Sequence, residues 1–379
     1  MLMKYRLFTP GPTSVPEETL MQLARPVHHH RTAEFRKVFG ELQDLLKYVF
    51  KTKENVYVIT GSGTAAFESA YTSVLSPGQK VLNVSNGKFA ERWGSYGKTF
   101  GMDVKEIKLP YGQHTTAEQV ENELKAGGFA AVTIVHSETS TGTTCDLQAI
   151  AKVTAKHNVL LIVDGITSIG ALPFDMDAWG VDVAITGSQK SLMLPPGLGY
   201  VSLSQKAQAA MKAAKTPNFY FDLKKYEKSI TDSDTPFTPA NTLIEAQLVS
   251  LKMIQSETIE GVWKRTTASA NAFRAGVQAL GFELFSQTPA DSVTAVKHKA
   301  GVTHKDFSNH LKNKHNIHIA GGQGTMEGQI FRVNHMGYSD VYDALVVVAA
   351  IEHTLKALGQ QVEFGKGVGA AQAALSGAF

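Results

Sequence analysis

The sequence predicts an α/β fold in which helices flank a mainly parallel sheet, followed by a smaller α+β domain. Over the first half of the chain, short apolar segments rich in β-branched residues alternate with longer amphipathic segments. The apolar segments are almost continuous in hydrophobic character, as strands buried on both faces are. The length of 379 residues favours more than one domain.

The first part of the chain contains the predicted sheet. Six segments have the strand pattern, namely 55–60, 80–85, 130–136, 159–164, 181–186 and 199–204. Four segments between them have the helical pattern, namely 64–75, 89–100, 116–126 and 147–157. In a sheet of this kind ligands bind beyond the carboxyl ends of the strands. The residues that follow each strand are therefore the candidates for function.

The pattern changes after Thr231, where a polar, proline-bearing connection precedes a long helical stretch over 243–280. Strands are then predicted at 282–285, 292–298, 316–320 and 329–334, and helices at 304–315 and 340–358. The last residues are rich in Gly and Ala and are expected to fray. We therefore expect an N-terminal arm (1–20), a large domain (21–255), a small domain (256–365) and a tail (366–379).

Composition excludes several classes of protein. The net charge is only +3 and no basic block with interleaved aromatic residues occurs, so a nucleic-acid partner is not expected. No apolar run has the length of a membrane span, and the N-terminus lacks the apolar segment of a secretory signal. The single cysteine, Cys145, excludes an internal disulfide and favours a reducing compartment. We therefore expect a cytoplasmic protein without a membrane partner.

Chemically active residues follow successive predicted strands. Asp164 ends one strand, and Lys190 follows the next strand before a Pro-Pro-Gly turn. The segment GSGT (61–64) ends the first strand and opens a helix, which presents backbone N–H groups to an anion. Phe89 opens the helix after the second strand, and HSETSTG (136–142) adds hydroxyl groups after another. Each residue alone also has an ordinary structural explanation, so the inference depends on their order at the strand ends.

Together these groups suit pyridoxal phosphate, which needs a lysine, an acid at the ring nitrogen, an anion site and a stacking ring. Lys190 must be deprotonated to attack the cofactor, and a partly desolvated site with nearby cations favours that form. Asp164 would keep the ring nitrogen protonated. Lys190, once released by the substrate, would move the proton at the substrate Cα. No metal is expected, because the run of three histidines ending at His30 has no carboxylate or cysteine at ligand spacing.

The chain resembles the class V aminotransferases of pyridoxal-phosphate fold type I, which include alanine–glyoxylate, serine–glyoxylate and phosphoserine aminotransferases. The resemblance covers nearly the whole chain. Its motifs are TPGPTSVP (9–16), HHRTAEF (29–35), TGSGTAAFE (60–68), NGKFAERW (86–93), HSETSTG (136–142), VDGITSIG (163–170), TGSQKSLMLPPG (186–197), TPFTPA (235–240), AGGQG (320–324) and IFRVNHMGY (330–338). The family's fold implies a mainly parallel sheet of seven strands.

The resemblance also implies a role for each matching residue. Lys190 would be the Schiff-base lysine, and Asp164 would pair with the pyridine nitrogen. Arg332 would hold the substrate α-carboxylate, for which a planar, charged fork is suited. The remaining cofactor contacts would be the phosphate turn Ser62, Gly63 and Thr64, the stacking ring of Phe89, the hydroxyl of Thr139 near the phenolic oxygen, and a phosphate contact from Gln189.

Members of the family are two-fold dimers whose active site lies at the interface. A threonine of the neighbouring subunit reaches the phosphate in relatives, and here Thr235 and Thr238 are both candidates. Some relatives supply a tyrosine where this chain has Asp234, so that contact is in doubt. His30 and Arg31 match a segment that approaches an anionic substrate side chain in phosphoserine aminotransferases. They either bind such a group or order the interface.

The resemblance implies a ping-pong transaminase that moves an amino group to a 2-oxo acid such as glyoxylate or pyruvate. Alanine or serine is the favoured donor, while an acidic donor such as aspartate or phosphoserine is the alternative that His30 and Arg31 suggest. Cysteine desulfuration would need a mobile cysteine in the small domain, and Cys145 lies in the large one. A non-catalytic scaffold subunit would be expected to lack Lys190, Asp164 or Arg332, and all three are present.

Overall fold

The computed structural model describes residues 3–377 and contains a central sheet of seven strands. The strand order is β2-β10-β9-β8-β5-β3-β4, and β10 is antiparallel to both of its neighbours while the other pairs are parallel. The bounds are β2 Val56–Thr60, β3 Lys80–Ser85, β4 Asp103–Lys108, β5 Phe129–Val135, β8 Leu160–Asp164, β9 Val183–Gly187 and β10 Leu198–Leu203. The prediction of a mainly parallel α/β sheet is confirmed.

Helices cover both faces of this sheet, and each face has its own apolar core. The helices are α1 Glu17–Leu23, α2 Ala33–Phe50, α3 Gly63–Val74, α4 Lys88–Thr99, α5 Ala117–Leu124, α6 Leu147–Lys156, α7 Met176–Trp179, α8 Gln205–Ala213, α9 Leu223–Ile230 and α10 Asn241–Glu257. Residues of α2, α5, α6 and α10 belong to one core, and residues of α3, α4, α8 and α9 to the other. No helix in the described part of the chain is long and apolar enough to cross a lipid bilayer.

The edge strand β4 is absent from the sequence prediction. Every position of its sequence, DVKEIK, is exposed or half-buried, and it pairs with β3 alone. Continuous apolar character identifies strands that are buried on both faces, and β4 does not have it, whereas the other edge strand, β2, does. The prediction therefore found the buried strands and missed the one exposed strand of this sheet.

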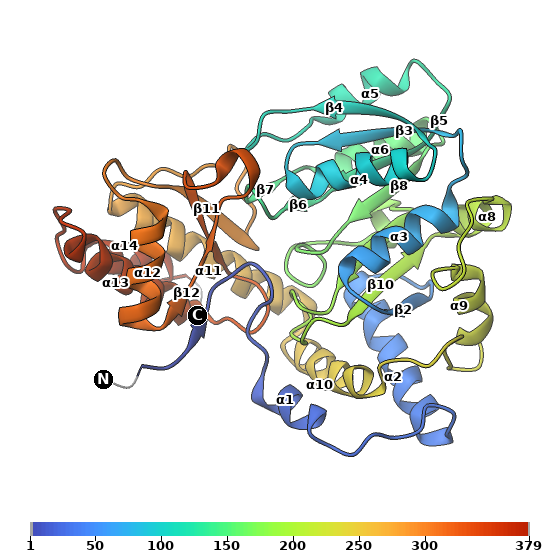
Figure 1. Ribbon diagram of the computed structural model, residues 1–379, viewed down its shortest axis with the longest axis horizontal. Coiled ribbons are helices and arrows are strands. Elements are labelled where there is room, and N and C mark those ends of the chain that lie inside the picture. Colours follow the sequence, from blue (N-terminus) through green and yellow to red (C-terminus); the bar gives the residue numbers. More distant parts are fainter. Residues whose placement is uncertain (1–2, 378–379) are drawn as a thin grey trace.

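The C-terminal part of the chain packs as a second unit beside the sheet (Figure 1). It contains α11 Ile259–Ala279, α12 His304–His315, α13 Val341–Ala357 and a three-stranded antiparallel sheet of order β11-β14-β13. These strands are β11 Val293–Lys297, β13 Ala320–Gly321 and β14 Ile330–Asn334. The N-terminal segment joins this unit, since β1 Arg6–Leu7 pairs in parallel with β12 Ile317–His318.

Two expectations for this part need correction. The stretch 243–280 is not one helix, because Thr258 has a φ of +67° and separates α10 from α11. The Thr258 hydroxyl then accepts a hydrogen bond from Gly261 N and begins the second helix. The segment 282–285 is not a regular strand, since it makes only one isolated bridge, between Leu284 and Val296.

The Gly/Ala-rich tail also differs from the expectation. Residues Lys366–Ala374 form α14, which packs against α11 and α13. Ala371 and Leu375 are buried in the same apolar core as Phe331. A weak helical pattern in the sequence is therefore stabilised by tertiary packing. Residues 378 and 379 of the predicted tail lie outside the described part of the chain.

Candidate active site

The parallel strands bring the predicted residues to one edge of the sheet. Asp164 is the last residue of β8, and its register partners are Val135 at the end of β5 and Ile185 in β9. The chain leaving β9 then turns and reaches Lys190. Because β5, β8 and β9 run in the same direction, the segments that follow them meet beyond the same edge.

Lys190 is enclosed by the N-terminal segment. Its side chain is 9% exposed, and Nζ donates a hydrogen bond of 2.6 Å to Pro10 O. Thr13 Oγ1 donates to Lys190 O at 2.9 Å. A Cβ on Gly11 would lie 1.9 Å from Lys190 Nζ, so only glycine allows this approach. The predicted N-terminal arm therefore forms one wall of the site.

The surroundings favour the neutral form of this lysine. Burial, assisted by the positive charges of Arg332 and Arg92, lowers the pKa of Lys190 to about 8, and Asp164 opposes that change. A buried ammonium loses hydration that a single carbonyl does not replace. The ammonium form still predominates at pH 7, where about a tenth of the amine is neutral.

Asp164 is a buried carboxyl group with few donors. It is 3% exposed, and Ile166 N donates to its Oδ1 at 2.9 Å. Burial and the negative charge of Glu138 raise the pKa of Asp164 to about 7, while Ile166 N and Lys190 act in the opposite direction. A further cationic or N–H donor would stabilise its ionised form.

The predicted phosphate turn lies at the N-terminus of α3. Ser62 is the N-cap residue, yet its hydroxyl accepts no hydrogen bond from the first turn of the helix. A Cβ on Gly63 would lie 2.7 Å from Ile166 Cδ1, so a larger residue would be crowded. Gln189 Oε1 is buried and has no hydrogen-bond partner among the described residues. Free amide groups at a helix N-terminus are suited to an anion.

Two further predicted contacts lie on neighbouring segments. Phe89 is half-buried near the start of α4, and the Arg92 guanidinium lies 4.8 Å from the centre of its ring. Thr139 follows the short strand β6 Ser137–Glu138, and its hydroxyl lies 3.0 Å from that of Thr167. Both positions are therefore fixed by contacts within the protein.

Arg332 reaches the sheet edge from the C-terminal unit. It is 4% exposed, and its Nε and Nη2 donate to Gly321 O at 2.9 and 2.7 Å. Its Nη1 donates to Thr139 O at 2.9 Å, which connects the two units of the fold. Burial lowers the pKa of Arg332 to about 10, so the guanidinium stays charged at neutral pH. The remaining N–H groups can hold a carboxylate.

The donor and acceptor set suits pyridoxal phosphate. Three polar groups are short of partners, namely the Ser62 hydroxyl as a cap, Gln189 Oε1 and the Asp164 carboxyl. The α3 turn suits the phosphate and Asp164 suits a protonated ring nitrogen, with Lys190 close enough to Asp164 for their charges to interact. Phe89 would cover the ring. These residues would therefore hold the group.

Four predicted residues have no direct contact with this centre. These residues are His30, Arg31, Thr235 and Thr238. Within residues 3–377, none of them makes a hydrogen bond or ion pair with Lys190, Asp164 or Arg332. Arg31 instead pairs with Asp234 at 2.7 Å and donates to Thr235 O at 3.1 Å. The Thr235 hydroxyl donates to Phe237 O at 2.9 Å, whereas Thr238 is exposed.

The sequence alone indicates no role for Glu138 or for the N-terminal residues that contact Lys190. Glu138 is fully buried and accepts hydrogen bonds from the first turn of α4. Both features fall inside motifs that were recognised, HSETSTG (136–142) and TPGPTSVP (9–16). Their burial and their distant partners were not visible in the sequence.

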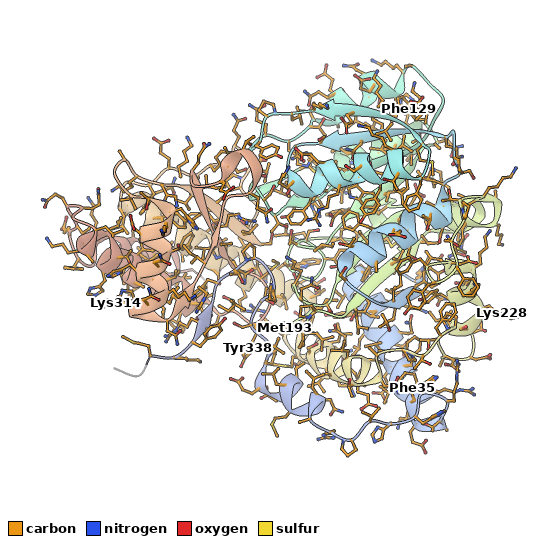
Figure 2. All side chains as sticks on the ribbon, in the orientation of Figure 1. Phe35, Phe129, Met193, Lys228, Lys314 and Tyr338 are labelled. Atoms are coloured by element: carbon orange, nitrogen blue, oxygen red, sulfur yellow. The ribbon has the colours of Figure 1, made fainter. Side chains whose placement is uncertain are left out.

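Two other features lie apart from the site. A cavity of about 790 Å³ lies between the N-terminal segment and the loop after β14. Figure 2 labels two of its lining residues, Met193 and Tyr338. None of the predicted site residues lines it. Burial raises the pKa of the Cys145 thiol, whose sulfur lies near His136 O. That environment disfavours the thiolate needed for nucleophilic chemistry.

Comparison with known proteins matches residues 7–339 to the family described as Aminotransferase class-V. The chain is 41% identical to a protein named soluble hydrogenase 42 kDa subunit from Anabaena cylindrica, over 98% of each chain. It is 36% identical to an L-aspartate–glyoxylate aminotransferase from Paracoccus denitrificans, over 97% of this chain and 95% of that protein. The crystal structure of an alanine–glyoxylate aminotransferase from Nostoc sp. has a TM-score of 0.89 at 29% identity, over 94% and 96% of the two chains.

Proposed function

The chain belongs to the class-V aminotransferases, and from that premise we propose that it moves the amino group of a small neutral L-amino acid, alanine or serine, to glyoxylate. It is a transaminase that uses pyridoxal phosphate. The observation that carries the proposal is the meeting of Lys190, Asp164 and Arg332 at one sheet edge from separate segments. Pyruvate, which is also a 2-oxo acid, is the alternative acceptor.

The residues of the sheet edge hold the cofactor. Pyridoxal phosphate supplies, when bound, an electron-withdrawing ring that makes the substrate Cα proton acidic. Ser62, Gly63 and Thr64 bind its phosphate through the α3 N-terminus, with Gln189 beside them. Phe89 covers the ring. The Asp164 carboxylate keeps a proton on the ring nitrogen, because an ionised acid next to a cation is favoured in a buried site.

Lys190 moves the proton at the substrate Cα. A general base acts best when its pKa lies close to the working pH, and burial brings the pKa of Lys190 to about 8. The carbonyl of Pro10 directs Nζ while the amine is free. The Lys190 amine would accept the proton from the substrate Cα and deliver it to the cofactor's aldehyde carbon.

Arg332 orients the amino acid. Its carbonyl partners, Gly321 O and Thr139 O, fix the plane of the guanidinium. The N–H groups left free bind the α-carboxylate, which every amino-acid donor and every 2-oxo acid acceptor carries. This contact binds both substrates of the ping-pong cycle and does not select between side chains.

The preference for a neutral donor rests on the state of Arg31. An acidic donor needs a second free cation for its side-chain carboxylate, and the Arg31 guanidinium is already paired with Asp234. His30 stacks on His29 with 5.0 Å between ring centres, and burial and Arg31 lower its pKa. Arg31 therefore orders the segment around Thr235, and a small neutral side chain suits the site better.

The proposal includes a homodimer in which Thr238 reaches the phosphate of the neighbouring subunit. Thr238 is exposed, whereas the Thr235 hydroxyl is already bonded to Phe237 O. Arg31 and Arg36 hold Asp234 beside this segment at 2.7 and 3.6 Å. Of the two candidate threonines, only Thr238 has a hydroxyl available for an external ligand.

The second candidate is an acidic donor, such as aspartate. Two observations favour it: the relative from Paracoccus denitrificans is named for aspartate, and His30 is only half-buried. A non-catalytic subunit is not favoured, although two relatives are named as hydrogenase subunits. Lys190, Asp164 and Arg332 are all present in a buried arrangement that a scaffold would not need.

The visible absorption spectrum of the protein loaded with pyridoxal phosphate tests the proposal. Addition of alanine or serine should bleach the cofactor band, and glyoxylate should restore it. Lys190→Ala is the control and should not form the wild-type band. Bleaching by aspartate or phosphoserine alone would overturn the neutral donor in favour of the second candidate. Absence of a band after cofactor addition would overturn the transaminase assignment.

A further inference from the structure

Glu138 accepts four hydrogen bonds in the interior of the protein. Its Oε2 accepts from Phe89 N at 3.1 Å and from Ala90 N at 2.8 Å. Its Oε1 accepts from Ser140 N at 2.9 Å and from Ser140 Oγ at 2.6 Å. The side chain is fully buried. Both carboxyl oxygens are therefore occupied by groups that donate.

The partners of Glu138 suit an ionised carboxylate. Burial raises the pKa of Glu138 on balance, although the hydrogen bonds from Ser140, Ala90 and Phe89 act in the opposite direction. A proton on Oε2 would face two backbone N–H groups that cannot accept it, and a proton on Oε1 could be accepted only by Ser140 Oγ. The N-terminus of α4 adds a favourable dipole. A Cβ on Gly87 would lie 2.4 Å from Glu138 Cγ, so the glycine before α4 makes room for the carboxylate.

The same carboxylate joins two parts of the active site. On one side it holds the first turn of α4, from which Phe89 extends. On the other it closes the turn after β6, where Thr139 O accepts a hydrogen bond from Arg332 Nη1. Ser140 Oγ links the two sides, because it also accepts from Lys88 N at 3.0 Å.

Resting on the function proposed above, we propose that Glu138 is a positioning residue. It sets the cofactor-stacking ring of Phe89 and the carboxylate-binding guanidinium of Arg332 relative to one another. It touches neither cofactor nor substrate. It acts through the backbone of α4 and through the carbonyl of Thr139.

The chain contains a matched control in Glu352. This residue is 3% exposed, and its carboxylate accepts from Gly365 N and Gly367 N at 2.8 Å and from Val368 N at 3.2 Å. It therefore also caps a helix N-terminus from a buried position, that of α14. Its surroundings belong to the core of the C-terminal unit and contain no predicted site residue.

The experiment compares Glu138→Gln with Glu352→Gln. Each substitution replaces one carboxylate oxygen by an NH2 group. The side chain keeps its shape, but only one of its two terminal atoms can still accept hydrogen bonds. Loss of charged hydrogen bonds predicts about 10-fold weaker pyridoxal-phosphate binding to apo-Glu138→Gln, and a KM for alanine raised about 10-fold. The visible circular dichroism of the bound cofactor should change as well. Glu352→Gln should lower the melting temperature and leave these three quantities at wild-type values.

Ser140→Ala gives a second measurement that keeps the buried carboxylate. It removes the hydroxyl that links Glu138 to Lys88 N, and should change the same three quantities in the same direction by about 3-fold. If Glu138→Gln does not fold, this variant decides the proposal.

The proposal is overturned if Glu138→Gln or Ser140→Ala binds and orients the cofactor as the wild type does. It is also overturned if Glu352→Gln produces the same spectral change. Cofactor affinity and circular dichroism do not require turnover. A change in both, without bleaching by any amino acid, would reject the proposed transamination and leave the positioning role of Glu138 supported.

Discussion

The carboxyl edge of the large sheet and the core around α11, α13 and α14 differ in how many hydrogen-bond partners their buried charged groups have. At the sheet edge, Lys190 has one carbonyl partner and Asp164 one amide donor, and Gln189 Oε1 has no partner among the described residues. In the C-terminal core, Glu352 is buried as deeply but receives three backbone N–H groups. The surrounding side chains there are apolar.

This difference distinguishes buried groups that are fully hydrogen-bonded within the protein from buried groups that can still bond to a ligand. A buried polar group without partners is destabilising, whereas a fully bonded one is close to neutral. The sheet edge therefore lowers the stability of the apoprotein, and the ligand supplies the missing partners. The following variants test that separation, from the largest expected effect to the smallest.

Lys190→Ala should have the largest effect on activity. The variant removes the group proposed to move the proton at the substrate Cα, and loss of general acid–base catalysis predicts a rate reduced by about 100- to 10,000-fold. Single-turnover kinetics with alanine would measure this rate. The visible band should also shift, because the variant would lack the proposed covalent link between Lys190 and the cofactor. A variant with wild-type turnover would refute the role of Lys190.

Asp164→Asn should reduce turnover by about 10- to 100-fold, because a neutral amide cannot stabilise a protonated ring nitrogen as a carboxylate does. The same substitution should raise the free energy of unfolding of the apoprotein. The pKa of Asp164 is raised to about 7, so between about pH 4 and pH 7 the folded protein keeps a proton that the unfolded chain releases.

The free energy of unfolding of the wild-type apoprotein should therefore fall as the pH rises through that interval. Asp164→Asn lacks this fall and should be more stable than the wild type by about 1 to 4 kcal/mol at pH 8. Below about pH 3, where Asp164 is protonated in both the folded and the unfolded wild-type chain, the difference should vanish. Urea unfolding at the two pH values gives the comparison. A variant less stable than the wild type at pH 8 would show that Asp164 is a structural residue.

Arg332→Lys should raise the KM for every donor by about 10-fold and lower kcat less, since a point charge replaces a bidentate fork. Initial rates with alanine, serine and aspartate would measure this effect. Equal losses for all three are expected, because the α-carboxylate is common to them. A loss restricted to aspartate would assign Arg332 to the side-chain carboxylate instead.

Leu375→Ala should have the smallest effect on activity. Leu375 lies after α14 in the C-terminal core and is 3% exposed. Its truncation should lower the free energy of unfolding by about 2 to 4 kcal/mol. Cofactor affinity at a temperature where the protein stays folded should be unchanged. A weaker cofactor affinity there would show that the two regions are coupled.

Much of the fold could be predicted because six of the seven strands in its large sheet are mostly buried. Continuous apolar character then identified β2, β3, β5, β8, β9 and β10, and chain order placed Asp164 and Lys190 at the strand ends. The same criterion missed β4, whose positions are all exposed or half-buried. It also missed the break at Thr258, because a single residue with positive φ leaves the apolar periodicity almost unchanged.

The sequence by itself determined the parallel sheet, the family and the chemical groups at the strand ends. These follow from local patterns and from residue types that one cofactor needs in a fixed order. The tertiary structure decided which groups are buried and what they contact. It placed Pro10 and Gly11 against Lys190 and paired Arg31 with Asp234. It also brought the Glu138 carboxylate within hydrogen-bond distance of Phe89 N. Such contacts join residues that are 49 to 203 positions apart, and burial at those points depends on packing that no local pattern encodes.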